Sequence, residues 1–297
     1  MSSIDFDFQR YVERQKDPHG VRSTDHPEFG DYAFSGDLRV LRQLKRVAPV
    51  RVVAESTVRF WRTVQRNKLL GESTKITPKN HTRLYELTAK CARTLDIVMP
   101  KVYVSSSGAL NAGTYGTDDD AFILLNAGLL NMLDDDEITF VIGHECGHLQ
   151  NNHVVYRTAV LFMTQGIVNY LKWAVGPATL ALHSWSRRGE VTCDRAGLLC
   201  CGSEEVALRT MFKVHLRSSE EMDPEAIEDY LDEQLEASRA GIGRLQELMS
   251  THPWMPKRIR ALQMFAKSNY YRAFIGERGG DPLDQVDREV EELLRII

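Results

Sequence analysis

Apolar and polar residues alternate with a helical period along most of this chain. Residues 36–68 carry one such pattern, and residues 80–95 carry another. After Gly202 the helical period returns, and it predicts an acidic helix from residue 224 to residue 249. The last residues, 286–297, predict a terminal helix packed on the protein, with a partner-binding helix as the alternative. The chain is therefore expected to be mainly helical.

Three short runs depart from this period. Residues 102–105, 111–116 and 121–125 are β-rich and are separated by Ser/Gly and Asp clusters. Runs of this length predict a small antiparallel or mixed sheet among the helices. Together the two patterns predict an α+β fold.

The pentad His-Glu-Cys-Gly-His at residues 144–148 is the most informative chemical motif of the sequence. On a helix, His144 and His148 lie four residues apart on one face, so both imidazoles can bind a single metal ion. Glu145 is rotated by about 100° from His144 and can act on a metal-bound water. Residues 133–142 provide aspartates for an N-cap and then apolar residues at helical spacing, which places the motif within a helix. This HExxH pattern predicts a zinc hydrolase, and the alternative is an ordinary helix with two structural histidines.

Catalytic zinc normally takes three protein ligands, so a third ligand is needed. One zincin pattern places a third histidine six residues after the second, but that position is Val154 here, and His153 lies one residue earlier. Glu190 and Asp194 offer another route, because they lie four residues apart on one face of a second predicted helix. Glu190 is expected to bind zinc while Asp194 accepts the distal N–H of a ligating histidine. The alternative is a solvated surface of acidic and basic residues.

Several segments of the chain follow one another in a characteristic order. They are Val102-Tyr-Val, Asn111-Ala112, Asn126-Ala-Gly-Leu-Leu, Asp135-Asp-Glu, the pentad with His153 beyond it, Glu190-Val-Thr-Cys-Asp-Arg-Ala-Gly, and Thr251-His-Pro followed by Arg258-Ile. In this order the chain resembles the M48 family of zinc metallopeptidases over roughly residues 75–265. The joint order is far more specific than any one of the segments.

The resemblance implies a zincin-like fold of the gluzincin type, with the small sheet beside the active-site helix. It implies one Zn²⁺ per chain, bound by His144, His148 and Glu190, with Glu145 as the general base. The sequence departs from the family at Cys193, where alanine is most often found. Cysteine is small, so this departure does not threaten the ligands.

The resemblance also implies the position of four residues around the substrate. Asn111 and Ala112 are expected on an edge strand that lines the cleft, and His252 and Arg258 are expected to approach from the C-terminal side. His252 or Arg258 could donate a hydrogen bond to the developing oxyanion. The alternative is that His252 caps a helix and Arg258 pairs with a neighbouring carboxylate.

These residues predict a zinc-dependent endopeptidase. Zinc lowers the pKa of its bound water, Glu145 takes the proton, and the resulting hydroxide attacks a peptide carbonyl. An extended polypeptide substrate is expected to bind against the edge strand near Asn111. The alternative is a non-catalytic interaction module stabilised by zinc, but such a module has no need of a general base.

Length and composition bound the remaining possibilities. The 297 residues are 43% hydrophobic and contain no Gly/Ser/Pro-rich linker, which favours one catalytic domain, residues 37–297, after a polar extension, residues 1–36. The net charge of −4, from 37 basic and 41 acidic residues, argues against nucleic-acid binding. The N-terminal residues lack the pattern of a secretory signal, and the five cysteines suit free thiols, so the cytoplasm is the expected location. The sequence does not indicate an oligomeric state.

Residues 158–186 need separate consideration, because the resembled family includes membrane proteins. A spanning helix requires about 20 apolar residues. Lys172 lies at the centre of this segment, and Gly176-Pro177 is expected to break the helix soon afterwards. The segment therefore predicts two short helices in a buried hairpin of a soluble enzyme, with a peripheral membrane-docking hairpin as the alternative.

Overall fold

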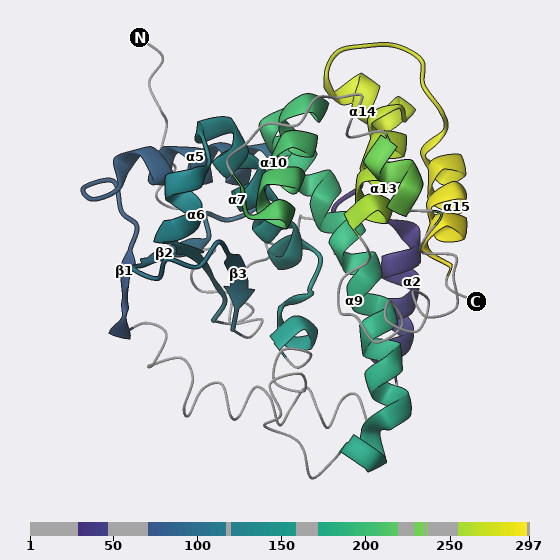
Figure 1. Ribbon diagram of the computed structural model, residues 1–297, viewed down its shortest axis with the longest axis horizontal. Helices are drawn as coiled ribbons and strands as arrows, with labels where there is room; N and C mark the ends of the chain where they lie inside the picture. Colours follow the sequence, from purple (N-terminus) through teal and green to yellow (C-terminus); the bar gives the residue numbers. More distant parts are fainter. Residues whose placement is uncertain are drawn as a thin grey trace.

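Two helices that pack against each other, α7 (Asp135–Gln150) and α9 (Lys172–Cys201), form the centre of the fold. In Figure 1 the sheet lies on one side of α9, and the N- and C-terminal helices α2 and α15 lie on the other. The computed structural model describes residues 29–46, 71–116, 120–158, 172–218, 229–234, 236 and 255–295. All five cysteines are free thiols, as the sequence predicts.

The start of α7 is held by a capping box. The Asp134 carboxylate accepts a hydrogen bond from the Glu137 N–H at 2.9 Å, and the Glu137 carboxylate accepts one from the Asp134 N–H at 3.0 Å. Two N–H groups that lack helical partners are thereby satisfied. The helix predicted around the HExxH motif is therefore confirmed, and its first residue is fixed by the aspartates that the sequence offered.

Glycines allow α7 and α9 to approach closely. A Cβ atom on Gly143 of α7 would lie 2.6 Å from the Cβ of Cys200, and one on Gly197 of α9 would lie 2.9 Å from the Phe140 carbonyl oxygen. Real Cβ atoms do not approach other atoms so closely, so any side chain at either position would push the helices apart. This close packing brings the pentad of α7 against the Glu190–Asp194 turn of α9.

The sheet has four strands among the described residues, in the order β1-β2-β4-β3. They are β1 (Ser73–Lys75), β2 (Lys101–Ser105), β3 (Ala112–Tyr115) and β4 (Phe122–Asn126). β2 and β4 are parallel and the other pairs are antiparallel, so the sheet is mixed. The three predicted runs all form strands. β1 was missed because its three residues, Ser-Thr-Lys, carry no apolar alternation.

The other long helices of the described ranges surround this centre, and their combination with one small sheet confirms the predicted α+β class. They are α2 (Ser35–Leu44), α5 (Thr82–Thr94), α10 (Glu204–Leu216), α13 (Met255–Ala266) and α15 (Leu283–Leu294), with the short helices α6 (Ala127–Met132) and α14 (Asn269–Phe274). The apolar residues of α15 are buried against Phe34, so the terminal helix packs on the protein as expected. The acidic helix predicted for residues 224–249 lies largely outside the described residues.

The last part of the predicted N-terminal extension packs on the helices of the described part of the chain. Tyr32 and Phe34 are buried, and Phe34 joins an apolar cluster with residues of α9, α13 and α15. Residues 1–28 lie outside the described part of the chain. The domain boundary at residue 36 stays a prediction.

The predicted helix break at Gly176-Pro177 is wrong, because α9 runs without interruption from Lys172 to Cys201. A proline removes one hydrogen bond of the helical ladder, and the remaining bonds of this long helix preserve its course. Residues 159–171 lie outside the described part, so the predicted hairpin stays untested. Within the described ranges, no helix combines the length and apolar character that crossing a bilayer requires.

Replacing Gly197 by alanine should lower the free energy of unfolding by about 1–3 kcal/mol, because the methyl group meets the backbone of Phe140. Urea denaturation followed by circular dichroism measures this change. Gly108→Ala is the matched control, since a Cβ there meets no atom within 4 Å, and it should change stability by less than about 0.5 kcal/mol. Equal losses in both variants would show that close helix packing is not the cause.

Candidate metal centre

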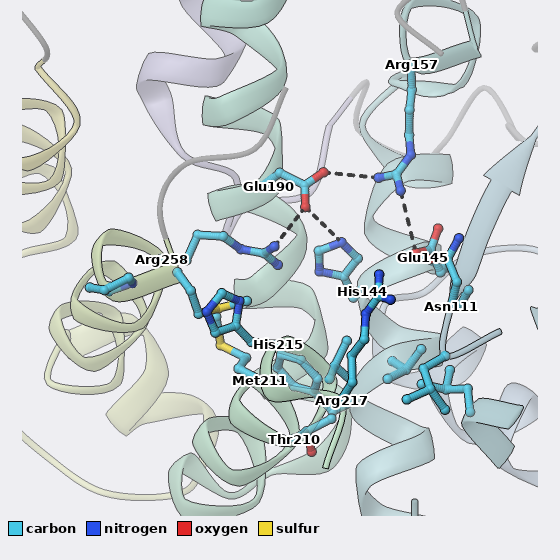
Figure 2. Close-up of a pocket in the computed structure, with 18 of the residues that line it drawn as sticks. Asn111, His144, Glu145, Arg157, Glu190, Thr210, Met211, His215, Arg217 and Arg258 are labelled. Carbon is cyan, nitrogen blue, oxygen red and sulfur yellow. Dashed lines mark hydrogen bonds and ion pairs between the residues drawn. The ribbon is translucent and has the colours of Figure 1, made fainter. Parts of the chain in front are cut away.

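The three predicted metal ligands meet at the interface of α7 and α9. His144 Nε2 lies 3.6 Å from one Glu190 oxygen, and His148 Nε2 lies 3.7 Å from the other. All three residues are buried, and Figure 2 shows Glu190 facing His144 across the site. The helical spacing of the histidines explains this placement, because residues four apart share one face.

The donor set fits zinc. Two ligands about 2.0–2.1 Å from one tetrahedral ion lie about 3.3 Å from each other, slightly less than the separations found here. Two imidazoles and one carboxylate are also a donor set of catalytic zinc, which keeps a fourth position open. Burial, followed by the charge of Arg157, holds the pKa of His148 well below its usual range, so its neutral imidazole can offer a lone pair.

The Arg157 guanidinium lies among these donors and stands in for the positive charge of a metal ion. Its Nη1 lies 3.1 Å from Glu190 Oε1 and also contacts Nε2 of His148, while its Nη2 lies 3.9 Å from Glu145 Oε1. Figure 2 shows the guanidinium reaching both glutamates. Sequence reasoning missed Arg157. The only indication in the sequence was its spacing, because Arg157 lies four residues, or one helical turn, after His153.

A second donor set is geometrically available. Ligand atoms of His144, His148 and Cys193 all lie within 4.8 Å of one another. The Cys193 sulfur, however, lies 3.7 Å from His153 Nδ1, the atom that also meets His148 Nδ1, whereas Glu190 meets Nε2 of both histidines. Burial and then the nearby Glu190 charge raise the pKa of the Cys193 thiol well above its usual value, which disfavours a thiolate. We therefore favour the set with Glu190.

Asp194 and Arg258 form the outer layer of the centre. His144 Nδ1 lies 3.0 Å from Asp194 Oδ1, so the carboxylate can accept the proton that leaves Nε2 free for a metal. Arg258 donates to both oxygens of Asp194, at 2.8 and 2.6 Å, and its Nη1 lies 3.2 Å from Glu190. Arg258 thus pairs with carboxylates, as the alternative interpretation held, and its role at an oxyanion stays a prediction. Burial alone would raise the pKa of Asp194, but Arg258 lowers it below the usual value.

Glu145 is held from the side of the sheet. The Thr114 hydroxyl on β3 donates to Glu145 Oε2 at 2.6 Å and lies 3.1 Å from the Glu145 carbonyl oxygen. The hydrogen bond fixes the carboxylate and leaves Oε1 directed toward Arg157. Thr114 was not predicted as a site residue, because nothing but its place in a predicted strand marked it.

A cavity of about 620 Å³ opens onto the centre. Asn111 and Ala112 line it beside His144, Glu145 and Arg258, and β3 is an edge strand of the described sheet. Much of the remaining wall is apolar and comes from Leu129, Phe140, Val141, Met211, Val214 and Met255. His252, predicted to approach this site, lies outside the described residues.

Comparisons with known proteins match the part of the chain that contains this centre. The model of peptidase family M48 matches residues 78–266. Plastoglobule-localized metallopeptidase 48 of Arabidopsis thaliana is 27% identical over 69% of this chain and 63% of its own length. A Protease HtpX homolog of Desulforapulum autotrophicum is 30% identical over 33% of this chain and 32% of its own length. Protease HtpX of Thioalkalivibrio sulfidiphilus is 26% identical over 63% of this chain and 72% of its own length.

The chain thus spans less than two thirds of the length of the first two of these relatives. No solved structure gives a significant match.

Replacing Arg258 by glutamine should lower the free energy of unfolding of the metal-free protein by about 3–5 kcal/mol at pH 7, because buried carboxylates lose their partner. The folded pKa of Asp194 is depressed, so its stabilisation is present above the ordinary carboxyl range and is lost as the pH falls through the folded value. The difference between the two proteins should therefore shrink below about pH 4. Urea denaturation between pH 3 and pH 8 measures it.

Arg260→Gln is the control for this prediction, because Arg260 lies on the same helix but pairs with the exposed Asp232. Its effect should stay within about 1 kcal/mol. A loss in Arg258→Gln that does not change with pH would rule out the ion pair as its source.

Proposed function

This chain belongs to peptidase family M48, and we propose that it is a zinc-dependent endopeptidase whose active site is the centre between α7 and α9. The observation that carries the proposal is the convergence of His144, His148 and Glu190 beside Glu145, at the edge of a large cavity. In this proposal the two histidines bind one zinc ion through Nε2, and Glu190 binds it through its carboxylate. When bound, zinc polarises a substrate carbonyl and lowers the pKa of a water molecule.

Arg157 and Asp194 have separate tasks in this scheme. Because the Arg157 guanidinium contacts His148 and Glu190, it must withdraw before a cation can take its place. Asp194 holds the Nδ1 proton of His144, which keeps the imidazole in the tautomer that presents Nε2. Arg258 holds Asp194 in turn through two hydrogen bonds.

Glu145 is the general base of the proposed reaction. Its carboxylate accepts a proton from the attacking water and then delivers that proton to the leaving amide nitrogen. Thr114 fixes one carboxylate oxygen and leaves the other on the side of Arg157. His252 or Arg258 remains the proposed donor to the oxyanion.

The substrate in this proposal is an extended polypeptide. β3 is an edge strand of the described sheet, and such a strand can pair with a peptide through main-chain hydrogen bonds. Asn111 and Ala112, at the start of β3, line the same cavity as Glu145. The apolar wall next to them favours an apolar substrate side chain beside the scissile bond.

Two observations disfavour the alternative, a zinc-stabilised interaction module. Structural zinc sites are closed, whereas this centre opens into a cavity that a substrate segment can enter. A structural site also needs no carboxylate base beside the ligands. The cytoplasmic location, with peripheral membrane contact as its alternative, stays a prediction. The name of the Arabidopsis relative places that protein at plastoglobules.

Replacing Glu145 by glutamine should lower peptide-bond cleavage by at least about 100-fold while leaving zinc bound, because only the proton acceptor is removed. Cleavage of a peptide library with and without a chelator, together with metal analysis, tests this. Glu205→Gln is the control, since Glu205 is an exposed glutamate outside the cavity. Wild-type cleavage by zinc-loaded Glu145→Gln would rule out this base.

Replacing Glu190 by alanine or by glutamine should sharply lower the zinc content, because one of three protein ligands is removed. Cys193→Ser should retain one zinc ion per chain, and Asp194→Asn should bind zinc about 10 to 100 times more weakly. Metal analysis after dialysis measures the content, and circular dichroism checks that each variant is folded. Full zinc in both Glu190 variants with loss in Cys193→Ser would assign the cysteine set instead.

A further inference from the structure

A buried series of polar side chains leads from the metal centre to the N-terminal part of the chain. His148 Nδ1 lies 3.1 Å from His153 Nδ1, and His153 Nε2 lies 3.0 Å from Asp37 Oδ2. His153 and Asp37 are wholly inaccessible to solvent. The Thr192 hydroxyl donates to the same Asp37 oxygen at 2.7 Å. A carboxylate in α2 therefore reaches a proposed zinc ligand through one intervening imidazole.

We propose that Asp37 and His153 are positioning residues that set the tautomer and orientation of His148 for zinc. This inference rests on the proposed function, because it takes His148 as a ligand. A His148 that presents the lone pair of Nε2 carries its proton on Nδ1, and that N–H faces Nδ1 of His153. His153 must then accept at Nδ1 and carry its own proton on Nε2. That nitrogen lies 3.0 Å from Oδ2 of the Asp37 carboxylate, close enough for an electrostatic contact, although the two groups are not aligned as a hydrogen bond.

The two histidines of the pentad thus have different outer partners. His144 meets the Asp194 carboxylate directly at 3.0 Å, whereas His148 meets His153 and reaches Asp37 through it. Partners of this kind orient metal-bound histidines, and their loss typically weakens metal binding 10- to 100-fold. An ionised aspartate can only accept a hydrogen bond. The buried carboxylate at the end of the series therefore favours the tautomer in which His153 carries its proton on Nε2 over the one in which it carries it on Nδ1.

The position of Asp37 depends on the docking of the segment that precedes it. The Gly30 N–H donates to the Asn151 side chain at 3.1 Å, and the Tyr32 hydroxyl donates to Gln150 at 2.7 Å. The Phe34 N–H donates to the Thr192 hydroxyl at 3.2 Å. Figure 1 shows α2 lying along α9, on which Thr192 is located. Several independent contacts thus hold α2 beside α9, and Asp37, more than a hundred residues before the HExxH motif, reaches the metal centre from there.

The test compares zinc affinity and histidine tautomers in Asp37→Asn and His153→Phe with those of the full-length wild type. Zinc dissociation constants come from competition with a chelator, and tautomers come from ¹⁵N spectra of the zinc-loaded protein. Both variants should bind zinc 10 to 100 times more weakly. In the wild type, His148 should carry its proton on Nδ1 and His153 on Nε2, and Asp37→Asn should mix the His153 tautomers.

Tyr32→Phe is the matched control, because it removes the two hydrogen bonds of the Tyr32 hydroxyl, with Gln150 and Asn151, without touching His153. This variant should lower the unfolding midpoint and leave zinc affinity within about twofold. A general loss of stability can then be distinguished from a specific loss of zinc affinity. A wild-type zinc affinity in Asp37→Asn, with zinc lost in His148→Ala, would overturn the inference and leave the proposed function intact. Wild-type zinc binding by His148→Ala would overturn both. If Asp37→Asn does not fold, a wild-type His153 protonated on Nδ1 would still overturn the inference.

Discussion

The close packing of α7 on α9 is the constraint on which the rest of this structure depends. Gly143 and Gly197 leave no side chain between the two backbones, so groups on one helix can touch groups on the other. The HExxH turn therefore meets the Glu190–Asp194 turn, although about forty residues separate them in the sequence. The sheet and the terminal helices then supply the partners for groups that this packing has buried.

Burial of so many acidic groups requires cations. Glu145, Glu190 and Asp194 carry three formal negative charges, and Arg157 and Arg258 carry two positive charges. One negative charge remains with both arginines in place. A divalent ion in the place of Arg157 would bring this group of charges to zero, because two positive charges would replace one. The electrostatic balance therefore agrees with the donor geometry in favouring a divalent metal.

Sequence reasoning found the features that depend on local spacing. The capping aspartates, the two histidines of α7 and the Glu190/Asp194 pair follow from a period of 3.6 residues, and the structure brings all of them together. The contributions of Arg157, Thr114 and Asp37 were not predictable in this way. Each comes from a different element, and only tertiary packing decides which side chains meet. The continuous course of α9 through Pro177 was also missed. A proline was expected to end the helix, but the other main-chain hydrogen bonds of this long helix maintain it.

The Arg157 guanidinium has a consequence for how tightly a metal ion can bind. Small zinc domains often cannot fold without metal, because their ligands would otherwise face one another without a partner. Here the Arg157 guanidinium contacts Glu190 and His148, so these groups have a cationic partner from the same chain. Metal binding at this centre would therefore be an exchange of cations, and its affinity would include the free energy of separating Arg157 from Glu190.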